Sequence, residues 1–192
     1  ESFKEVVAWR RHLHAHPELS YEEFNTSKFV AAQLRTFGIE PQEGIATTGI
    51  VALIKGKNPE KKSVALRADM DALPIQEINN VSYKSTNPGV MHACGHDVHT
   101  TCLLGAAKIL QELKDQWSGT VKLIFQPGEE KNPGGASLMI KEGVLDDPRP
   151  AAIFGLHVHP QMPVGLLSFR EGKVMASADE IYITIKAKGG HA

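Results

Sequence analysis

The sequence contains few cysteines, no excess of basic residues and no long apolar run, and each shortage excludes a class of protein. Of its 192 residues only Cys94 and Cys102 are cysteines. That is too few for a disulfide framework, so we expect a reduced, cytoplasmic protein. The 21 Lys and Arg residues are balanced by 22 Asp and Glu residues, which leaves no basic surplus to bind nucleic acid. No apolar segment approaches the roughly 18 residues of a membrane helix, so we expect no membrane partner.

Histidine, by contrast, is abundant. The nine histidines matter because imidazole is a common metal ligand and titrates near neutral pH. We interpret His12, His14 and His16, which lie around the end of the first predicted helix, as surface or capping residues. The hydrophobic content of 42% can supply a substantial core.

Apolar periodicity predicts alternating helices and strands. Segments with apolar residues at helical spacing predict helices over 3–14, 21–38, 98–113 and 136–142. Short β-branched or aliphatic runs predict strands over 49–54, 63–67, 120–126 and 152–156, the last of them buried. This alternation predicts an α/β fold, a three-layer αβα domain with a mainly parallel sheet.

The end of the chain has a different pattern. Residues 180–188 alternate between polar and apolar side chains, which is typical of a strand in a half-exposed sheet. We therefore predict a first domain over 1–174 and the incomplete start of a second domain over 175–192.

Polar motifs directly follow three of the predicted strands. They are Asp69, the pair Glu129-Glu130, and His157. Open α/β sheets bind ligands beyond the carboxyl ends of their strands. We therefore expect these side chains to share one site.

The segment Cys94-Gly95-His96 places a thiol and an imidazole on either side of one glycine. The glycine lets the backbone bend so that both side chains converge on one ion. Taken alone, the motif is equally compatible with a buried free cysteine beside a helix-capping Asp97.

Two adjacent carboxylates follow the strand 120–126. Neighbouring side chains point in different directions, so one of Glu129 and Glu130 could bind metal while the other takes a proton from water. For an isolated pair of glutamates, an exposed acidic loop is the commoner explanation.

The remaining candidates are one histidine and two aspartates. A lone histidine such as His157 is more often structural, but Cys, His and Glu together at successive strand ends favour a borderline divalent ion. We interpret Asp71 as a carboxylate that orients a histidine ligand, and Asp69 as a further candidate near the metals. Turn-forming aspartates that bond nearby amides are an equally good explanation of both.

Several motifs now occur in order along the chain, and together they resemble one family. They are His16-Pro17-Glu18, the segment from Arg67 to Pro74, Cys94-Gly95-His96-Asp97, Gln126-Pro127-Gly128-Glu129-Glu130, Gly155-Leu156-His157 and Gly189-Gly190-His191-Ala192. The sequence resembles the amidohydrolase branch of the metallopeptidases, which includes hippurate hydrolase, bacterial N-acyl-amino acid amidohydrolases and plant auxin-conjugate hydrolases. The resemblance spans essentially the whole chain.

The resemblance implies a site for two divalent metal ions, either zinc or manganese, with cobalt or nickel as alternatives. By this resemblance Cys94 bridges the two ions, while His96 and Glu130 complete one site. His157 binds the second ion, and Glu129 is the general base. A last histidine ligand belongs to a longer chain, and no position here corresponds to it.

The resemblance also implies a substrate and a partner. The expected reaction is hydrolysis of the amide bond of a small N-acyl amino acid, which releases a carboxylic acid and an amino acid. Family members carry a small inserted α+β lid domain through which they form a homodimer. In that domain a histidine matching His191 stabilises the oxyanion in the partner's site.

Two other functions stay open on the sequence. Cys94 could act as a nucleophile paired with His96 or His157, as in thiol hydrolases. Alternatively, the chain could be a non-catalytic module that holds metal or dimerises.

Overall fold

The structure is a computed structural model that describes residues 2–175 and 181–190. It divides into two units, residues 1–158 and residues 159–192. Among the described residues, all the helices and strands lie in the first unit. None of the helices among the described residues combines the length and the apolar character needed to span a bilayer.

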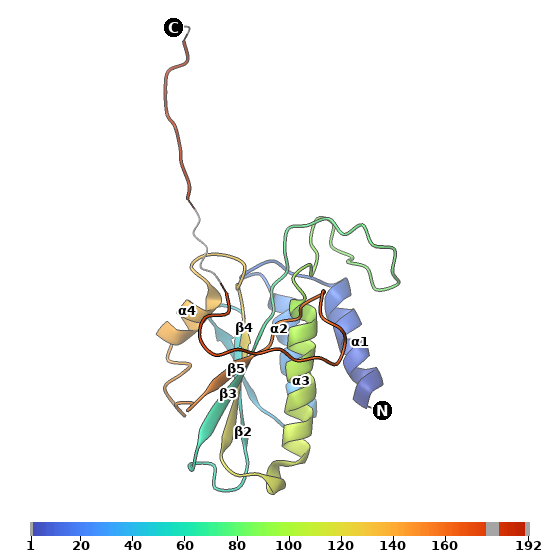
Figure 1. The fold of residues 1–192 in the computed structure, drawn as a ribbon, viewed down its shortest axis with the longest axis vertical. Helices are drawn as coiled ribbons and strands as arrows, with labels where there is room; N and C mark the ends of the chain where they lie inside the picture. Colours follow the sequence, from blue (N-terminus) through green and yellow to red (C-terminus); the bar gives the residue numbers. More distant parts are fainter. Residues whose placement is uncertain (1, 176–180, 191–192) are drawn as a thin grey trace. The chain divides into compact units, whose positions relative to one another are not determined.

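The first unit is built on a five-stranded mixed sheet (Figure 1). Its strands are β1 (Pro41–Ile45), β2 (Gly49–Lys55), β3 (Ser63–Asp69), β4 (Thr120–Gln126) and β5 (Ile153–Gly155). They lie in the order β1-β2-β4-β3-β5. β3 pairs in parallel with β4 and β5, whereas β2 pairs antiparallel with β1 and β4.

The expectation of a mainly parallel sheet was therefore wrong for the half that contains β1 and β2. These two strands are joined by residues 46–48 only. So short a connection can form only an antiparallel pair, because a parallel pair needs a crossover of a dozen or more residues. β1 itself was not predicted, since the three residues between its ends are exposed and lack an apolar pattern.

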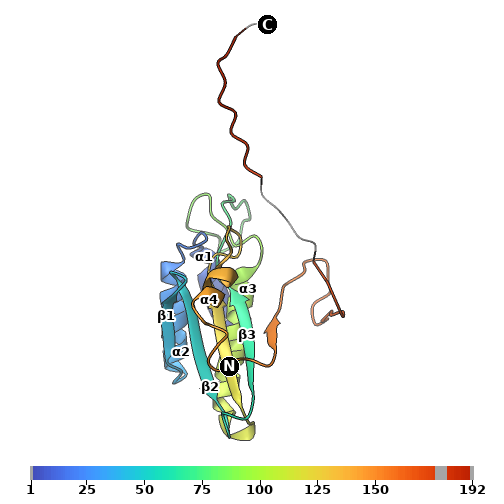
Figure 2. The ribbon, with the colours of Figure 1, turned by 90° about the vertical axis from the view of Figure 1, so that its left-hand side faces the viewer.

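Helices cover both faces of the sheet, which confirms the three-layer α/β fold (Figure 2). They are α1 (Ser2–Ala15), α2 (Phe24–Thr36), α3 (His96–Glu112) and α4 (Gly135–Lys141), with a short 3₁₀ turn η1 (Lys114–Gln116) after α3. Side chains of α1, α2 and α3 form one core with one face of the sheet, and α4 packs on the opposite face.

Successive side chains of β4 point to opposite faces of the sheet and so contribute to the hydrophobic cores on both faces. Leu123 and Phe125 are fully buried on the side of α1 to α3, while Ile124 packs with Met139 of α4 and with Val144. Fully burying an apolar side chain of this size stabilises the fold by about 1.5–3 kcal/mol. The central strand is therefore fixed on both faces, and so is the direction of the loop that follows it.

Two helix starts differ from the prediction. Tyr21 has a φ of +68°, a left-handed conformation that a helix excludes, so α2 begins only at Phe24. α3 begins at His96, directly after Gly95 with a φ of +90°. His96 therefore lies in the first turn of a rigid helix.

Strand β5 was predicted as buried and is not. Ile153 and Phe154 are 53% and 58% exposed, because β5 is an edge strand that pairs on one side only, with β3.

The strand predicted over 180–188 is also not formed in the described part of that segment, where residues 181–188 are exposed and have no regular secondary structure. A strand needs a hydrogen-bonded neighbour to be stable, and no strand pairing involves these residues in the described structure. Residue 180 lies outside the described residues. The domain boundary expected after residue 174 stays a prediction.

Candidate metal centre

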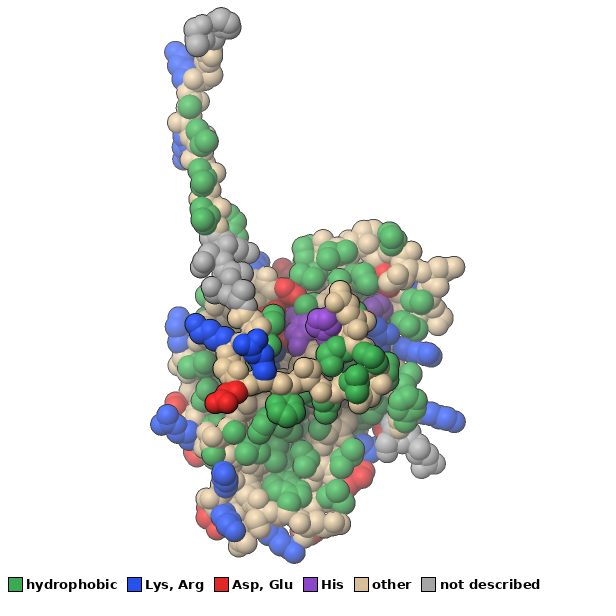
Figure 3. All heavy atoms as spheres, in the orientation of Figure 1, with side chains coloured by type: hydrophobic (Ala, Val, Ile, Leu, Met, Phe, Trp, Pro, Cys, Tyr) green, Lys and Arg blue, Asp and Glu red, His purple; other side chains and the backbone are tan. Residues whose placement is uncertain are grey.

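The motifs singled out in the sequence lie at one edge of the sheet. β3, β4 and β5 are parallel, so their carboxyl ends share that edge. Asp69 ends β3, Glu129-Glu130 follows β4, and His157 follows β5, while the first turn of α3 contributes His96. Histidine side chains cluster on the face shown in Figure 3.

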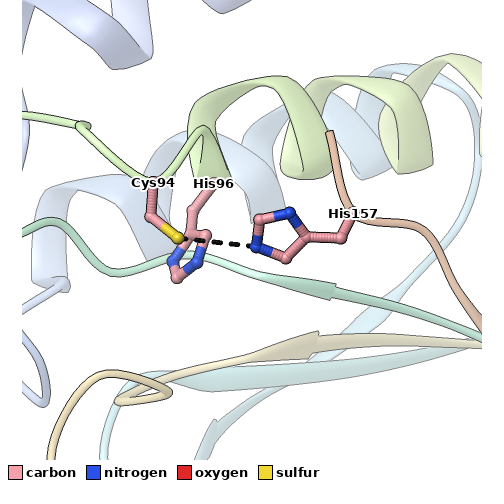
Figure 4. A group of neighbouring side chains, drawn as sticks. All are labelled: Cys94, His96 and His157. Atoms are coloured by element: carbon pink, nitrogen blue, oxygen red, sulfur yellow. Dashed lines mark hydrogen bonds between the residues drawn. The ribbon is translucent and has the colours of Figure 1, made fainter. Parts of the chain in front are cut away.

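Cys94, His96 and His157 point toward a common space (Figure 4). The Cys94 Sγ lies 3.4 Å from the Nε2 of His157. One ligand atom from each of the three residues lies within 4.8 Å of the others. A thiol and two imidazoles at this spacing form a donor set that suits zinc or another borderline divalent ion.

The ring of His96 is oriented by Asp71. Its Nδ1 lies 2.9 Å from the backbone oxygen of Asp71 and 3.3 Å from the carboxylate Oδ1 of the same residue. Both oxygens can only accept, so Nδ1 carries the proton and donates it. The lone pair of Nε2 therefore faces the site, as metal-binding histidines require.

The Nε2 of His96 and the Oε1 of Glu130 are both buried without a hydrogen-bond partner. They lie 3.7 Å apart. Leaving a buried polar atom unpaired costs about 1–3 kcal/mol, and two such atoms face each other here. A cation bound to both would remove this penalty, so the residues present fit a metal ion.

Asp71 holds a second predicted ligand as well. Its Oδ2 accepts the backbone N–H of Glu130 at 2.9 Å and the hydroxyl of Ser20 at 2.6 Å. Burial alone would raise the pKa of Asp71, but the hydrogen bonds from His96, Ser20 and the backbone lower it overall. Asp71 is therefore an ionised carboxylate that joins α3 to the loop after β4.

Asp69 lies at the same edge but is occupied by other partners. Its Oδ1 is 2.6 Å from the Nδ1 of His99, and its Oδ2 accepts a hydrogen bond from Arg67 at 2.6 Å. Burial would raise the pKa of Asp69, but His99, Arg67 and His96 together lower it to about 2. Its Oδ2 is also 3.7 Å from the Nε2 of His96, so Asp69 lies beside the predicted ligands.

Glu129 differs from its neighbour in exposure. Its side chain is exposed, yet its ligand atom lies within 4.8 Å of those of His96 and Glu130. Partial burial and the nearby carboxylates of Glu130 and Asp69 raise its pKa. An accessible carboxylate of raised basicity suits a group that exchanges protons with water.

Two histidines were missed or misjudged in the sequence. His99 was not singled out, although it lies three residues after His96 and therefore on the same helix face. His14 was interpreted as a surface or capping residue, which was wrong. It is only 4% exposed and bonds Asp97 and Glu77. His191 lies outside the described residues.

The sequence pattern of the peptidase family M20/M25/M40 matches residues 65–188. The chain belongs to this family. The matched segment contains every predicted metal ligand, Glu129 and both aspartates of the site. It confirms the metallopeptidase resemblance that the motifs predicted.

Curated relatives support membership of the M20 family across nearly the whole chain. Thermostable carboxypeptidase 2 of Saccharolobus solfataricus is 48% identical over 98% of this chain and 49% of its own length. An N-acyl-L-amino acid amidohydrolase of Geobacillus stearothermophilus is 46% identical over 97% of this chain and 50% of its own length. The chain thus spans about half the length of these relatives.

The fold agrees with a solved member of the family. A dinuclear metal-binding peptidase of the M20 family from Bacillus subtilis is 42% identical. It superposes with a TM-score of 0.81, over 85% of this chain and 45% of that one. The three-layer catalytic fold of an M20 peptidase is therefore present here in part.

Proposed function

We propose that the complete protein is a metal-dependent amidohydrolase that cleaves N-acyl amino acids into a carboxylic acid and an amino acid. The observation that carries this proposal is the pair of buried, unpartnered atoms, His96 Nε2 and Glu130 Oε1, beside Cys94 and His157. The family and the N-acyl-L-amino acid amidohydrolase relative support the reaction type. The dinuclear peptidase from Bacillus subtilis supports the use of divalent metal ions.

Cys94, His96, Glu130 and His157 would hold the two ions. His96 and Glu130 would serve one ion and His157 the other, and Cys94, whose Sγ groups with His96 and His157, would contribute to the same centre. We propose zinc or manganese, with cobalt or nickel as alternatives, because the donors mix sulfur, nitrogen and oxygen. When bound, such ions lower the pKa of water and polarise an amide carbonyl.

The chain's own residues supply the proton transfers. Glu129 takes a proton from the attacking water and returns it to the leaving amine. Its exposed position beside the ligands and its raised pKa support this role. Asp71 keeps His96 and Glu130 in place while Glu129 moves protons. We also propose that His191 stabilises the oxyanion in the partner's site of a homodimer formed through a lid domain.

The surroundings of Cys94 argue against the thiol-hydrolase alternative. Burial and the carboxylates of Glu130, Glu129 and Asp69 raise the pKa of Cys94 to about 12. A thiol in such acidic surroundings is a poor nucleophile without a cation beside it.

The decisive experiment uses the complete protein and a panel of N-acyl amino acids. Hydrolysis is followed by release of free amino acid, before and after chelation and after metal is restored. Glu129→Gln should lower kcat by about 10³-fold while the metal content stays unchanged. Glu60→Gln, at an exposed position in the turn before β3, is the matched control and should keep full activity.

Other outcomes separate the alternatives. Full activity after chelation, combined with loss on thiol alkylation, would identify Cys94 as a nucleophile instead. A complete protein that binds metal but hydrolyses no member of the panel would support the non-catalytic module. Activity in Glu129→Gln would remove Glu129 from the role of base.

A further inference from the structure

The imidazole of His99 is held at both nitrogens by groups from different elements. Its Nδ1 lies 2.6 Å from the Oδ1 of Asp69, at the end of β3. Its Nε2 accepts the backbone N–H of Val158 at 2.9 Å. The ring is buried on α3, three residues after His96.

These contacts fix the tautomer of His99. A backbone N–H can only donate, so the Nε2 of His99 must present its lone pair to Val158. The ring proton is then on Nδ1 and is donated to Asp69. His99, Asp69 and His96 also have the spacing of a metal-binding triplet, but with both nitrogens engaged His99 has no lone pair left for an ion.

Asp69 is itself held in place. Arg67 donates to its Oδ2 at 2.6 Å, and the hydroxyl of Thr100 donates to its backbone oxygen at 2.8 Å. A chain of hydrogen bonds therefore runs from β3, through the side chain of His99, to the backbone directly after His157.

Few other hydrogen bonds position the segment that carries His157. β5 has three residues, its side chains are exposed, and its pairing with β3 ends at Gly155. His157 is exposed, and its Nδ1 bonds only the backbone oxygen of the next residue among the hydrogen bonds of the described chain. The bond from Val158 to His99, together with the edge contact between the His99 and His157 rings at 4.6 Å between centroids, ties this segment to α3.

We propose that His99 is a positioning residue for the metal centre. By accepting the backbone N–H of Val158, it sets His157 so that its Nε2 faces the Sγ of Cys94. The inference rests on the proposed function, because it assumes that His157 is a ligand. It goes further because it assigns a role to His99, whose ring nitrogens are both engaged in hydrogen bonds within the chain.

The test measures metal binding rather than turnover. Metal-free complete protein is titrated with cobalt(II), and the number of bound ions and their affinities are read from the visible spectrum. In His99→Phe, which keeps a planar ring but loses both hydrogen bonds, the affinity for one ion should fall by about 10–100-fold. The ion held by His96 and Glu130 should bind as in the wild type.

A matched control separates positioning from loss of stability. His14 is as buried as His99 and also bonds carboxylates, but it lies in another network. His14→Phe should lower the melting temperature and still bind both ions with wild-type affinity. His99→Gln, whose amide can accept from Val158 and donate to Asp69, should recover part of the lost affinity.

The outcomes distinguish the two proposals. If the wild type binds no cobalt, the proposed function fails, whatever the variants do. If the wild type binds two ions and His99→Phe binds both equally well, the positioning role is overturned.

A second measurement does not depend on the variants folding. The nitrogen-15 spectrum of the metal-free wild type should show His99 with a protonated Nδ1 and an unprotonated Nε2. The opposite tautomer would contradict the proposal.

Discussion

The carboxylate of Asp71 accepts the backbone N–H of Glu130 at 2.9 Å while its other oxygen lies 3.3 Å from the ring of His96. One buried, ionised side chain therefore sets two proposed ligands that come from different elements, the first turn of α3 and the loop after β4. Neither ligand is placed by its own strand or helix alone. The geometry of the centre depends on this shared carboxylate.

Replacing Asp71 should therefore weaken metal binding without removing a ligand. In Asp71→Ala both His96 and Glu130 lose an acceptor, and metal affinity should fall by about 10–100-fold. Calorimetric titration of the metal-free protein measures this directly. Asp115→Asn, in the exposed turn η1, serves as the control, and equal affinities in the two variants would contradict the role of Asp71.

Gly95 should be intolerant of any side chain for two separable reasons. Its φ of +90° disfavours other residues by about 1–2 kcal/mol. A Cβ there would also lie 2.3 Å from the Cγ2 of Val158, next to His157. Gly95→Ala should therefore lower both the free energy of unfolding and the affinity for one metal ion.

Two further variants separate these reasons. Gly89 also has a positive φ, but a Cβ there meets nothing within 4 Å, so Gly89→Ala should show the conformational penalty without any change in metal affinity. Adding Val158→Ala to Gly95→Ala should recover metal affinity but not the full stability. If the double variant binds metal no better than Gly95→Ala, contact with Val158 is not the cause.

His14 should make stability depend on pH near neutrality. The hydrogen bond to Asp97 raises its pKa above 6.5 against the effect of burial, and Glu77 adds to this, while Arg10 opposes it. Because the folded pKa is raised, the stabilisation is complete below pH 6.5 and is lost as the pH rises through the folded pKa. Thermal melts should therefore show that the melting temperature falls more steeply between pH 6 and pH 8 in the wild type than in His14→Gln.

The absolute effect of losing His14 should also be large. His14→Ala leaves the buried carboxylates of Asp97 and Glu77 without this partner, which should cost on the order of 3 kcal/mol. Parallel pH profiles of the melting temperature in the wild type and His14→Gln would show that folding leaves the pKa of His14 unchanged, which would contradict the prediction.

The sequence predicted best the helices and strands whose own residues determine their structure. β4 was predicted with the bounds it has, because the short β-branched and aliphatic segment between Gly119 and Pro127 favours a strand over a helix. The proposed ligands were singled out because Glu130 and His157 follow strands, and because Cys94 and His96 flank a glycine directly before a helix. β1 was missed because its formation depends on pairing with β2, not on its own side chains.

The sequence singled out Asp71 as a carboxylate that orients a histidine, but the other groups that hold the site could not be predicted, because their partners are distant in sequence. His99 bonds an aspartate 30 residues away, and Glu23 bonds a backbone amide 105 residues away. Lys122 is another such case, a lysine in a buried strand whose ammonium group donates to the backbone oxygens of Val144 and Asp147. Apolar periodicity carries no information about such contacts.

Glu23 offers a test of how the loop that carries Glu129 is held. It is fully buried, and its two oxygens accept the backbone N–H of Gly128 at 2.7 Å and the hydroxyl of Thr48 at 2.5 Å. Glu23→Ala would leave both donors buried and unpaired, at about 1–3 kcal/mol each. It should therefore destabilise the fold and lower kcat by displacing Glu129.

Glu23→Gln is the informative comparison. Its amide oxygen can accept from Gly128 while its NH₂ group donates to the hydroxyl oxygen of Thr48, so the loop should keep its position and most of its activity. Burial raises the pKa of Glu23, although the hydrogen bonds oppose this. The wild type should therefore lose stability relative to Glu23→Gln as the pH rises through the folded pKa. Urea unfolding of both proteins between pH 4 and pH 8 measures this difference in the free energy of unfolding. If the wild type instead gains stability relative to Glu23→Gln as the pH rises, Glu23 is stabilised as a carboxylate.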